Sequence, residues 1–192
     1  MKIATILGSP RKKGNTNRVL RWIEDALQAQ GHEVDRINTS DHKVKGCKGC
    51  FTCKKFTDKP GCPQKDDALE IINRLIASDI ILYGSPIYFW GPTSQMKTLI
   101  DRHCCLVKGY GTPQWKSFLE GKGLGLVVTC EDAVEKNTDL MEEMFTRLVD
   151  YLKCDHLGSL IIPLTTTPEA LGEDVRHGAL AFAHQISGFI TE

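Results

Sequence analysis

The sequence carries no net charge, because 24 lysine and arginine residues balance 24 aspartate and glutamate residues. It therefore lacks the field that would attract nucleic acid or an anionic membrane, and we expect neither as a partner. No apolar run reaches the roughly 18 residues of a membrane span, and the apolar stretch at the start is too short for a signal peptide. These absences favour a cytoplasmic protein.

Two common phosphate-binding motifs are also missing. The dinucleotide pattern G-x-G-x-x-G does not occur. The P-loop pattern G-x-x-x-x-G-K-S/T fails because Asn15 replaces its lysine. A nucleotide phosphate bound by this chain must therefore be held by another kind of loop.

The pattern of apolar residues predicts strands that alternate with helices along the whole chain. Strand-like runs occur at residues 2–7, 32–37, 79–85, 124–129 and 157–162. Helical spacing occurs at residues 19–27, 67–76, 93–103, 140–152 and 168–190. Five apolar strands with helical crossovers indicate an α/β fold: a parallel sheet covered on both faces, within one domain spanning residues 1–192. Ligands of such sheets bind beyond the carboxyl ends of the strands.

The loop after the first strand is rich in groups that bind phosphate. It combines hydroxyl and amide side chains with two glycines at the positive end of a helix, and Arg11 adds a cation. The alternative is an ordinary polar turn in which Asn15 or Thr16 caps the helix. The phosphate-binding candidates are Ser9, Arg11, Gly14, Asn15, Thr16 and Asn17.

The loop after the third strand holds three consecutive aromatic residues between prolines and glycines. A flat ligand resting on this turn would cover their apolar faces. The alternative is packing against a neighbouring subunit or against the last helix. A phosphate site at one loop and a flat ring at the other together describe flavin mononucleotide (FMN). The ring-binding candidates are Pro86, Ile87, Tyr88, Phe89 and Trp90.

A cysteine-rich loop, residues 44–66, follows the second predicted strand and holds four of the eight cysteines. Without an export signal, cysteines indicate thiols, metal ligands or redox chemistry rather than disulfides. Four readings stay open: a [4Fe–4S] cluster, a structural zinc ion, a reducible Cys-x-x-Cys pair, and free thiols. The candidate metal ligands are Cys47, Cys50, Cys53 and Cys62.

These motifs, in this order, resemble the NAD(P)H-dependent FMN reductases. The resemblance covers roughly residues 2–130, and the cysteine loop is similar to that of the iron-sulfur flavoproteins within that group. It departs from that pattern in one respect, because eight residues separate Cys53 from Cys62. A gap of this length costs little loop-closure entropy.

The resemblance implies a flavodoxin-like three-layer sandwich with strand order 2-1-3-4-5, FMN as cofactor, and a homodimer or homotetramer. It assigns the third flavin loop to Thr129, Cys130 and Glu131. The implied activity passes electrons from NAD(P)H or ferredoxin through FMN, and through a [4Fe–4S] cluster if one is present, to a quinone, flavin or other acceptor. The alternative is a flavodoxin-like electron carrier without catalysis. We predict no catalytic residue, because the flavin carries the redox chemistry.

Overall fold

The computed structural model describes residues 1–189 and is built around a parallel sheet. The sheet has five strands in the order β2-β1-β3-β6-β7, and all four neighbouring pairs run parallel. Its strands are β1 (Lys2–Leu7), β2 (Glu33–Asn38), β3 (Ile80–Pro86), β6 (Gly123–Thr129) and β7 (Asp155–Ile162). Numbered within this sheet alone, the order is the predicted 2-1-3-4-5.

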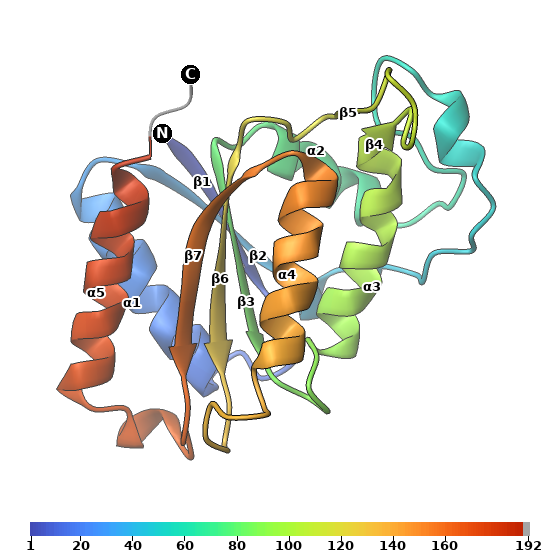
Figure 1. Cartoon of the computed structure of the whole chain (residues 1–192). Coiled ribbons are helices and arrows are strands. Elements are labelled where there is room, and N and C mark those ends of the chain that lie inside the picture. The colour runs from blue at the N-terminus through green and yellow to red at the C-terminus, as the bar shows by residue number, and fades with distance from the viewer. Residues whose placement is uncertain (190–192) are drawn as a thin grey trace.

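Helices cover both faces of the sheet, as Figure 1 shows. One layer contains α1 (Asn15–Ala29) and α5 (Glu173–Ser187); the other contains α2 (Ala68–Ile76), α3 (Ser94–Arg102) and α4 (Asp139–Leu152). Residues 1–189 also contain four short 3-10 helices: η1 (Thr39–Asp41), η2 (Thr52–Lys55), η3 (His103–Leu106) and η4 (Pro168–Ala170). The α/β prediction is confirmed as a flavodoxin-like three-layer sandwich. Across residues 1–189, no helix combines the length and apolar character needed to cross a membrane.

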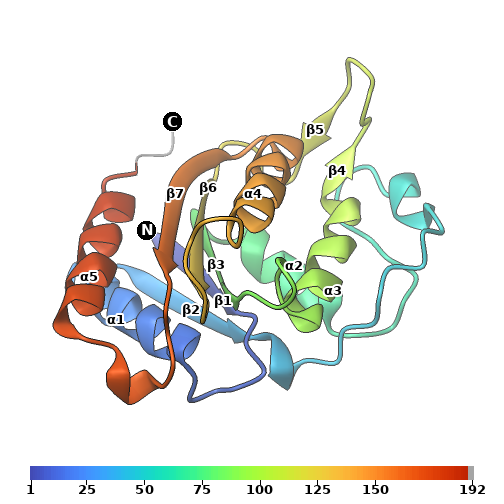
Figure 2. The ribbon, with the colours of Figure 1, turned by 60° about the horizontal axis from the view of Figure 1, so that its bottom comes forward.

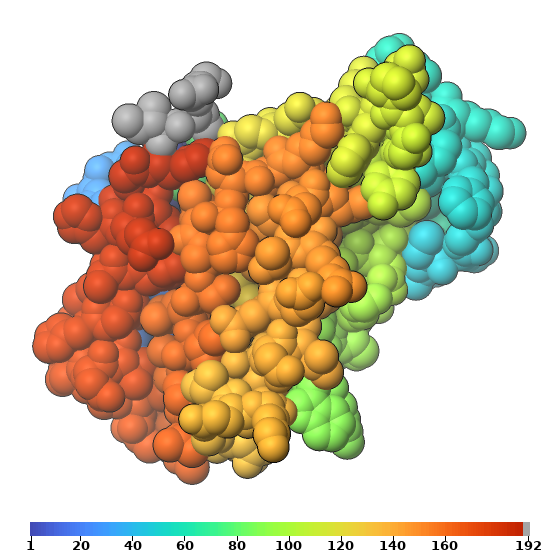
Figure 3. All heavy atoms as spheres, viewed as in Figure 1, coloured from blue at the N-terminus to red at the C-terminus, as the bar shows by residue number. Residues whose placement is uncertain are grey.

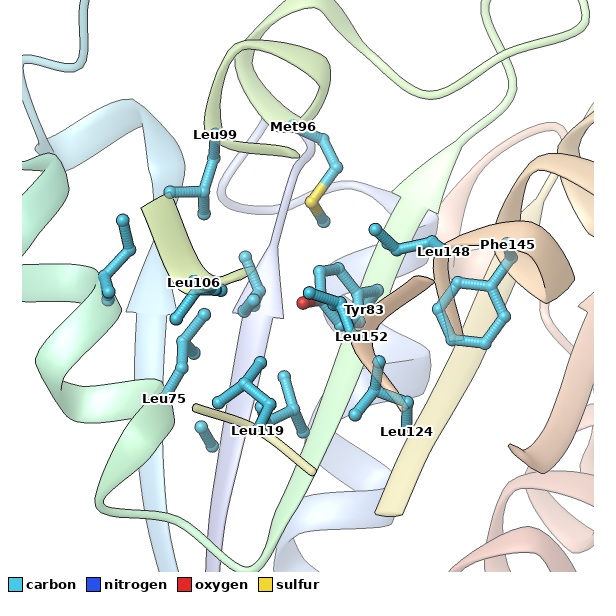
Figure 4. Packing of buried hydrophobic residues seen from close by; sticks show 14 of the residues in the cluster. Leu75, Tyr83, Met96, Leu99, Leu106, Leu119, Leu124, Phe145, Leu148 and Leu152 are labelled. Carbon is cyan, nitrogen blue, oxygen red and sulfur yellow. The ribbon is translucent and has the colours of Figure 1, made fainter. Parts of the chain in front are cut away.

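The central strand β3 is buried along its whole length, as expected for a strand covered on both faces. On one side Tyr83 packs edge-on against Phe145 of α4, with ring centroids 5.7 Å apart. Figure 4 shows this ring among the apolar side chains of the same cluster, with Leu148 and Leu152 close by. On the other side the Leu20 side chain occupies the space beside Gly84, where a Cβ atom would meet it at 2.4 Å. Close packing on both faces of the sheet therefore holds β3 in place, and with it the start of the loop that follows.

The element boundaries differ from the sequence prediction mainly near the carboxyl end. The last helix was predicted from residue 168, but α5 begins at Glu173. Pro168 instead opens the separate short helix η4, and Leu171 and Gly172 adopt extended backbone angles that interrupt the helix. The predicted end of this helix at Ile190 lies outside the described residues.

A small hairpin between α3 and β6 was not predicted. It consists of β4 (Val107–Lys108) and β5 (Lys116–Ser117), which pair antiparallel. Two residues per strand are too few to produce a recognisable alternation of apolar and polar side chains. Figures 1 and 2 both show the hairpin beside residues 44–66, the segment that carries the four clustered cysteines.

Candidate functional site

The loop after β1 leads into α1 with its backbone donors free. Gly14 takes the N-cap position in an extended conformation, and no side chain caps the helix. The capping role considered for Asn15 or Thr16 is therefore not observed. The first N–H groups of a helix have no intrahelical partner, and the helix dipole makes this end attractive to an anion.

Three loops are joined to one another at the carboxyl edge of the sheet. The Gly8 N–H donates to the Gly84 carbonyl at 2.7 Å, and the Thr93 hydroxyl donates to the Gly8 carbonyl at 2.6 Å. The Ile87 N–H donates to the Thr129 carbonyl at 3.0 Å. These bonds connect the loops that follow β1, β3 and β6, and Figure 2 turns this edge toward the viewer.

The three loops line a cavity of about 370 Å³. This volume lies within the range of small-ligand sites. Predicted residues that line it are Ser9, Arg11, Asn15, Thr16, Pro86, Ile87, Tyr88, Phe89, Trp90, Thr129, Cys130 and Glu131. We call it the loop cavity. Gly14 and Asn17 were also predicted to bind phosphate, yet neither lines it. The Asn17 side-chain oxygen instead accepts a hydrogen bond from Arg36 Nη1 at 2.8 Å.

Polar groups at the α1 end of the loop cavity are only partly satisfied within the chain. The Asn15 amide nitrogen donates to the Thr166 carbonyl at 3.4 Å, while its buried Oδ1 has no partner within the described residues. Among residues 1–189, Arg11 forms no ion pair. An unpaired acceptor, a free cation and free backbone N–H groups suit a ligand that carries both hydroxyl and phosphate groups.

The aromatic end of the loop cavity is exposed and conformationally strained. Phe89 is 93% exposed and Trp90 is 52% exposed, and both have positive φ angles, 49° and 62°. Non-glycine residues rarely adopt this conformation, and such strain is concentrated at functional sites. In Figure 3 the green loop after β3 projects from the lower edge of the molecule, away from α5. Packing on the last helix, one of the two alternatives considered, is therefore not observed.

Three residues of the loop cavity were missed by sequence reasoning: Asp132, Asn137 and Thr165. Thr165 follows β7 and binds back to the Cys130 carbonyl through its N–H at 2.8 Å and its hydroxyl at 3.0 Å. The same rule that placed ligands at the carboxyl ends of the strands would have included the loop after the fifth strand. Burial raises the pKa of the Cys130 thiol, so this side chain faces the cavity in its neutral form.

A second cavity lies at the other end of α3. This helix begins beside the aromatic loop and ends at Arg102, a rise of about 13 Å over nine residues. The cavity has a volume of about 100 Å³. Its lining includes all four predicted metal ligands, Cys47, Cys50, Cys53 and Cys62, together with Arg102, Cys104 and Cys105. We call it the cysteine cavity. It shares no residue with the loop cavity.

A buried ion pair forms the base of the cysteine cavity. Arg102 and Asp66 have side chains that are 2% and 1% exposed, and their closest atoms, Nη1 and Oδ2, are 2.6 Å apart. Arg102 Nη1 also donates to the Lys45 carbonyl at 2.8 Å, and Nη2 donates to Cys62 Sγ at 3.2 Å. Burial would raise the pKa of the Asp66 carboxyl, but the hydrogen bonds from Arg102, Lys45 and Ala68 outweigh it and hold this pKa below its usual value. Arg102 thus connects both ends of the cysteine loop to α3.

The four loop cysteines differ in exposure and in acid strength. Cys47 and Cys50 are exposed, Cys62 is half-buried and Cys53 is buried. Hydrogen bonds from the Thr52 hydroxyl and N–H lower the pKa of the Cys50 thiol, whereas burial, with the nearby Cys104, raises the pKa of Cys53. Among residues 1–189, no three histidine, cysteine, aspartate or glutamate side chains surround a common point as ligands of a single ion would. All four loop cysteines nevertheless line the cysteine cavity, and cysteine thiolates are the usual ligands of iron–sulfur clusters.

Two lysines bind backbone carbonyls near the cysteine cavity, and a buried histidine, His103, precedes Cys104 in the sequence. Lys108 donates to the Cys53 carbonyl at 2.6 Å, and burial lowers the pKa of its ammonium group. Lys54 donates to the carbonyls of Cys104 and Val107, both at 2.7 Å. His103 is bonded through Nε2 to the Tyr83 hydroxyl at 2.9 Å, and burial lowers the pKa of its imidazole to about 4.

The fold and the loop cavity together define a flavodoxin-like protein with a cavity at the carboxyl edge of its sheet, and comparison with known proteins identifies its family. The NADPH-dependent FMN reductase family matches residues 1–142, so the chain belongs to this family. The predicted resemblance is confirmed. The chain is also 41% identical over 102 residues to a protein named iron-sulfur flavoprotein from Archaeoglobus fulgidus, a match that covers 53% of this chain and 45% of that protein. It thus spans about half the length of this relative.

Solved structures support the fold at low sequence identity. An NAD(P)H:quinone oxidoreductase from Methanothermobacter marburgensis superposes with a TM-score of 0.70 at 16% identity, over 98% of this chain and 95% of the other. An FMN-dependent NADH-azoreductase from Bacillus anthracis, solved in complex with FMN, has a TM-score of 0.70 at 10% identity, over 98% of this chain and all of the other. These similarities establish the fold and leave the substrate open.

Proposed function

We propose that this protein is an FMN-dependent NAD(P)H oxidoreductase, with residues 1–192 as one domain. The observation that carries the proposal is the loop cavity, which joins an uncapped helix N-terminus to a projecting aromatic loop. Family membership supports it. When bound, FMN would accept a hydride from NADH or NADPH and supply electrons to a quinone, a flavin or another acceptor.

The residues of this chain would divide the cofactor between two ends of the loop cavity. Arg11, Ser9 and the first N–H groups of α1 would hold the phosphate, and the unpaired Asn15 Oδ1 would accept a bond from a ribityl hydroxyl. Residues 86–90 would cover the ring, and residues 129–131 would complete its binding loop. No side chain is assigned a proton-transfer step.

Titration with FMN tests the proposed site. We expect the wild-type protein to bind FMN, followed by the quenching of flavin fluorescence, and Arg11→Gln to weaken binding about 30-fold through loss of a charged hydrogen bond. Lys13→Gln is the matched control, because Lys13 is an exposed cation of the same loop that does not line the cavity. A protein that fails to bind FMN, or equal losses in the two variants, would contradict the proposal.

Turnover separates an enzyme from an electron carrier. With FMN bound, we expect steady-state oxidation of NADH or NADPH when a quinone, free flavin or ferricyanide is the acceptor. FMN binding without such turnover would instead favour the electron carrier. Reduction of the bound FMN by reduced ferredoxin would then be the next measurement. The homodimer or homotetramer expected from the family resemblance is checked by sedimentation of the FMN-bound protein.

We further propose that Cys47, Cys50, Cys53 and Cys62 hold a [4Fe–4S] cluster. The proposal is supported by the four cysteines that line one cavity and by the Arg102 bond to Cys62. Iron and acid-labile sulfide are measured on protein prepared without oxygen, together with the visible spectrum. We expect iron and sulfide in near-equal amounts in the wild type and their loss in Cys62→Ala. Cys154→Ala is the control, because Cys154 does not line the cysteine cavity, and this variant should retain both iron and sulfide. Zinc alone, or no metal, would favour one of the other three readings.

A further inference from the structure

Two lysines connect the cysteine loop to the β4–β5 hairpin by reciprocal hydrogen bonds. Lys54, next to Cys53, donates across to the Val107 carbonyl at 2.7 Å. Lys108, next to Val107, donates back to the Cys53 carbonyl at 2.6 Å. Each ammonium group therefore binds the backbone beside the other lysine, and the two positive charges are held close together beside Cys53, which lines the cysteine cavity.

The positive charge of this pair is not balanced within the described part of the chain. Lys108 is only 7% exposed. Neither Lys54 nor Lys108 has a carboxylate within 4 Å among residues 1–189, whereas Arg102 is paired with Asp66. Carbonyl dipoles satisfy the N–H donors but leave two like charges in a partly desolvated place, which is costly. Such an arrangement becomes favourable when an anion is present nearby.

We propose that Lys108, presented by the β4–β5 hairpin, is a positioning and charge-balancing residue for an anionic occupant of the cysteine cavity. Its hydrogen bond fixes the backbone of Cys53, and its charge, together with that of Lys54, would offset the net negative charge of an iron–sulfur cluster together with its four thiolate ligands. The inference rests on the proposed cluster. Groups outside the ligand set govern both the retention of a metal centre and its reduction potential.

The experiment compares Lys108→Met with two other variants, each as iron-free protein and after anaerobic reconstitution with iron and sulfide. Methionine keeps an apolar stem of similar length but removes the charge. Lys116→Met is the matched control, because Lys116 is the exposed cross-strand partner of Lys108 in the same hairpin. Lys108→Arg keeps the charge and should restore the wild-type behaviour. The measurements are the rise in melting temperature on reconstitution, the rate of iron loss to a chelator, and the midpoint potential.

We expect Lys108→Met to lose iron about tenfold faster than the wild type, a loss typical of groups outside the ligand set. Its melting temperature should rise less on reconstitution, and its midpoint potential should be more negative, because a nearby cation favours the reduced, more negative form. The rise in melting temperature is taken within each variant, so a general loss of stability in Lys108→Met cancels.

Three outcomes overturn the inference in different ways. If the wild type retains a cluster and Lys108→Met behaves like Lys116→Met in all three measurements, the role of Lys108 is wrong and the proposed cluster stands. If the wild type retains no iron and sulfide, the proposed cluster fails and the role of Lys108 fails with it. A loss that Lys108→Arg does not restore would show that the side-chain shape matters and its charge does not, which also contradicts the proposal.

Discussion

The loop cavity and the cysteine cavity lie at opposite ends of α3 and are built in different ways. The loop cavity forms where β1, β3 and β6 end, so the regular sheet determines which loops meet. The cysteine cavity forms where a long irregular loop meets the end of α3, with the β4–β5 hairpin beside it. The first depends on the whole fold, whereas the second depends on a few buried polar contacts. We therefore expect the two cavities to respond independently to mutation.

The largest expected effect is at the base of the cysteine cavity. Asp66→Asn leaves the buried Arg102 cation without its counter-charge, and we expect the free energy of unfolding to fall by about 3–5 kcal/mol. Urea unfolding of the protein free of iron and FMN measures this. Asp101→Asn is the control, because it breaks the exposed Lys97–Asp101 pair of the same helix and should cost less than about 1 kcal/mol.

The same variant tests whether the cavities are independent. We expect Asp66→Asn to lose its iron while its affinity for FMN stays within about twofold of the wild type, since mutations at separate sites without shared partners act additively. FMN titration at a temperature where the variant is folded gives the answer. An equally large loss of FMN affinity would mean that α3 transmits the disturbance from one cavity to the other.

The buried His103 should make stability depend on pH. Its pKa is lowered to about 4 by burial, against an ordinary value of 6.5. Between these values the unfolded chain binds a proton that the folded protein does not, so stability present above pH 6.5 is lost as the pH falls toward 4. Between pH 7 and pH 5 this amounts to about 2 kcal/mol.

The variant His103→Gln isolates this contribution. It removes the titrating group and can still bond to the Tyr83 hydroxyl, so the fall in unfolding free energy between pH 7 and pH 5 should shrink by the same amount. Urea unfolding at the two pH values measures the difference. Parallel pH profiles in the two proteins would show that the imidazole is not held neutral in the folded state.

The contrast between the cavities also explains what the sequence could predict. Strand β1 was predicted with its observed bounds, and the loops at the carboxyl edge follow from strand order alone. That order brought together most of the predicted flavin-binding residues. It could not reveal that Asn17 turns toward Arg36, because this depends on which way one side chain of α1 points.

The surroundings of the cysteine cavity were beyond sequence reasoning for a different reason. The four loop cysteines are visible from their spacing, but the cavity is also lined by Cys104 and Cys105, which lie outside the cysteine-rich loop. The contacts of Lys54 with Val107 and of Lys108 with Cys53 join segments more than 50 residues apart. No local pattern marks such contacts, and the two-residue strands that position Lys108 leave no periodic signal.

A smaller effect is expected inside the loop cavity from Thr16→Val. The Thr16 and Thr129 hydroxyls lie 2.7 Å apart and connect the start of α1 to the end of β6. Valine preserves the shape and removes the hydrogen bond, and we expect the free energy of unfolding to fall by about 1 kcal/mol. Because the backbone N–H of residue 16 remains, FMN affinity should fall less than in Arg11→Gln. A larger loss of affinity than in Arg11→Gln would assign phosphate binding to the hydroxyl.

The smallest effect on stability is expected at the tip of the aromatic loop. Phe89→Gly relieves the cost of a positive φ angle, about 1 kcal/mol, but increases the freedom of the unfolded chain by a similar amount. The side chain is 93% exposed, so little packing is lost. We therefore expect the free energy of unfolding to change by less than about 0.5 kcal/mol.

The same substitution should nevertheless weaken FMN binding, because the exposed ring of Phe89 lines the loop cavity and would cover the flavin. FMN titration and urea unfolding of Phe89→Gly, each beside Phe89→Leu, which keeps apolar bulk, separate the two quantities. A loss of affinity at constant stability would mean that the strain at this loop is maintained for ligand binding. If the free energy of unfolding fell by more than about 1 kcal/mol and FMN affinity did not change, Phe89 would contribute to packing instead. The FMN site would then not include Phe89, although this residue lines the loop cavity.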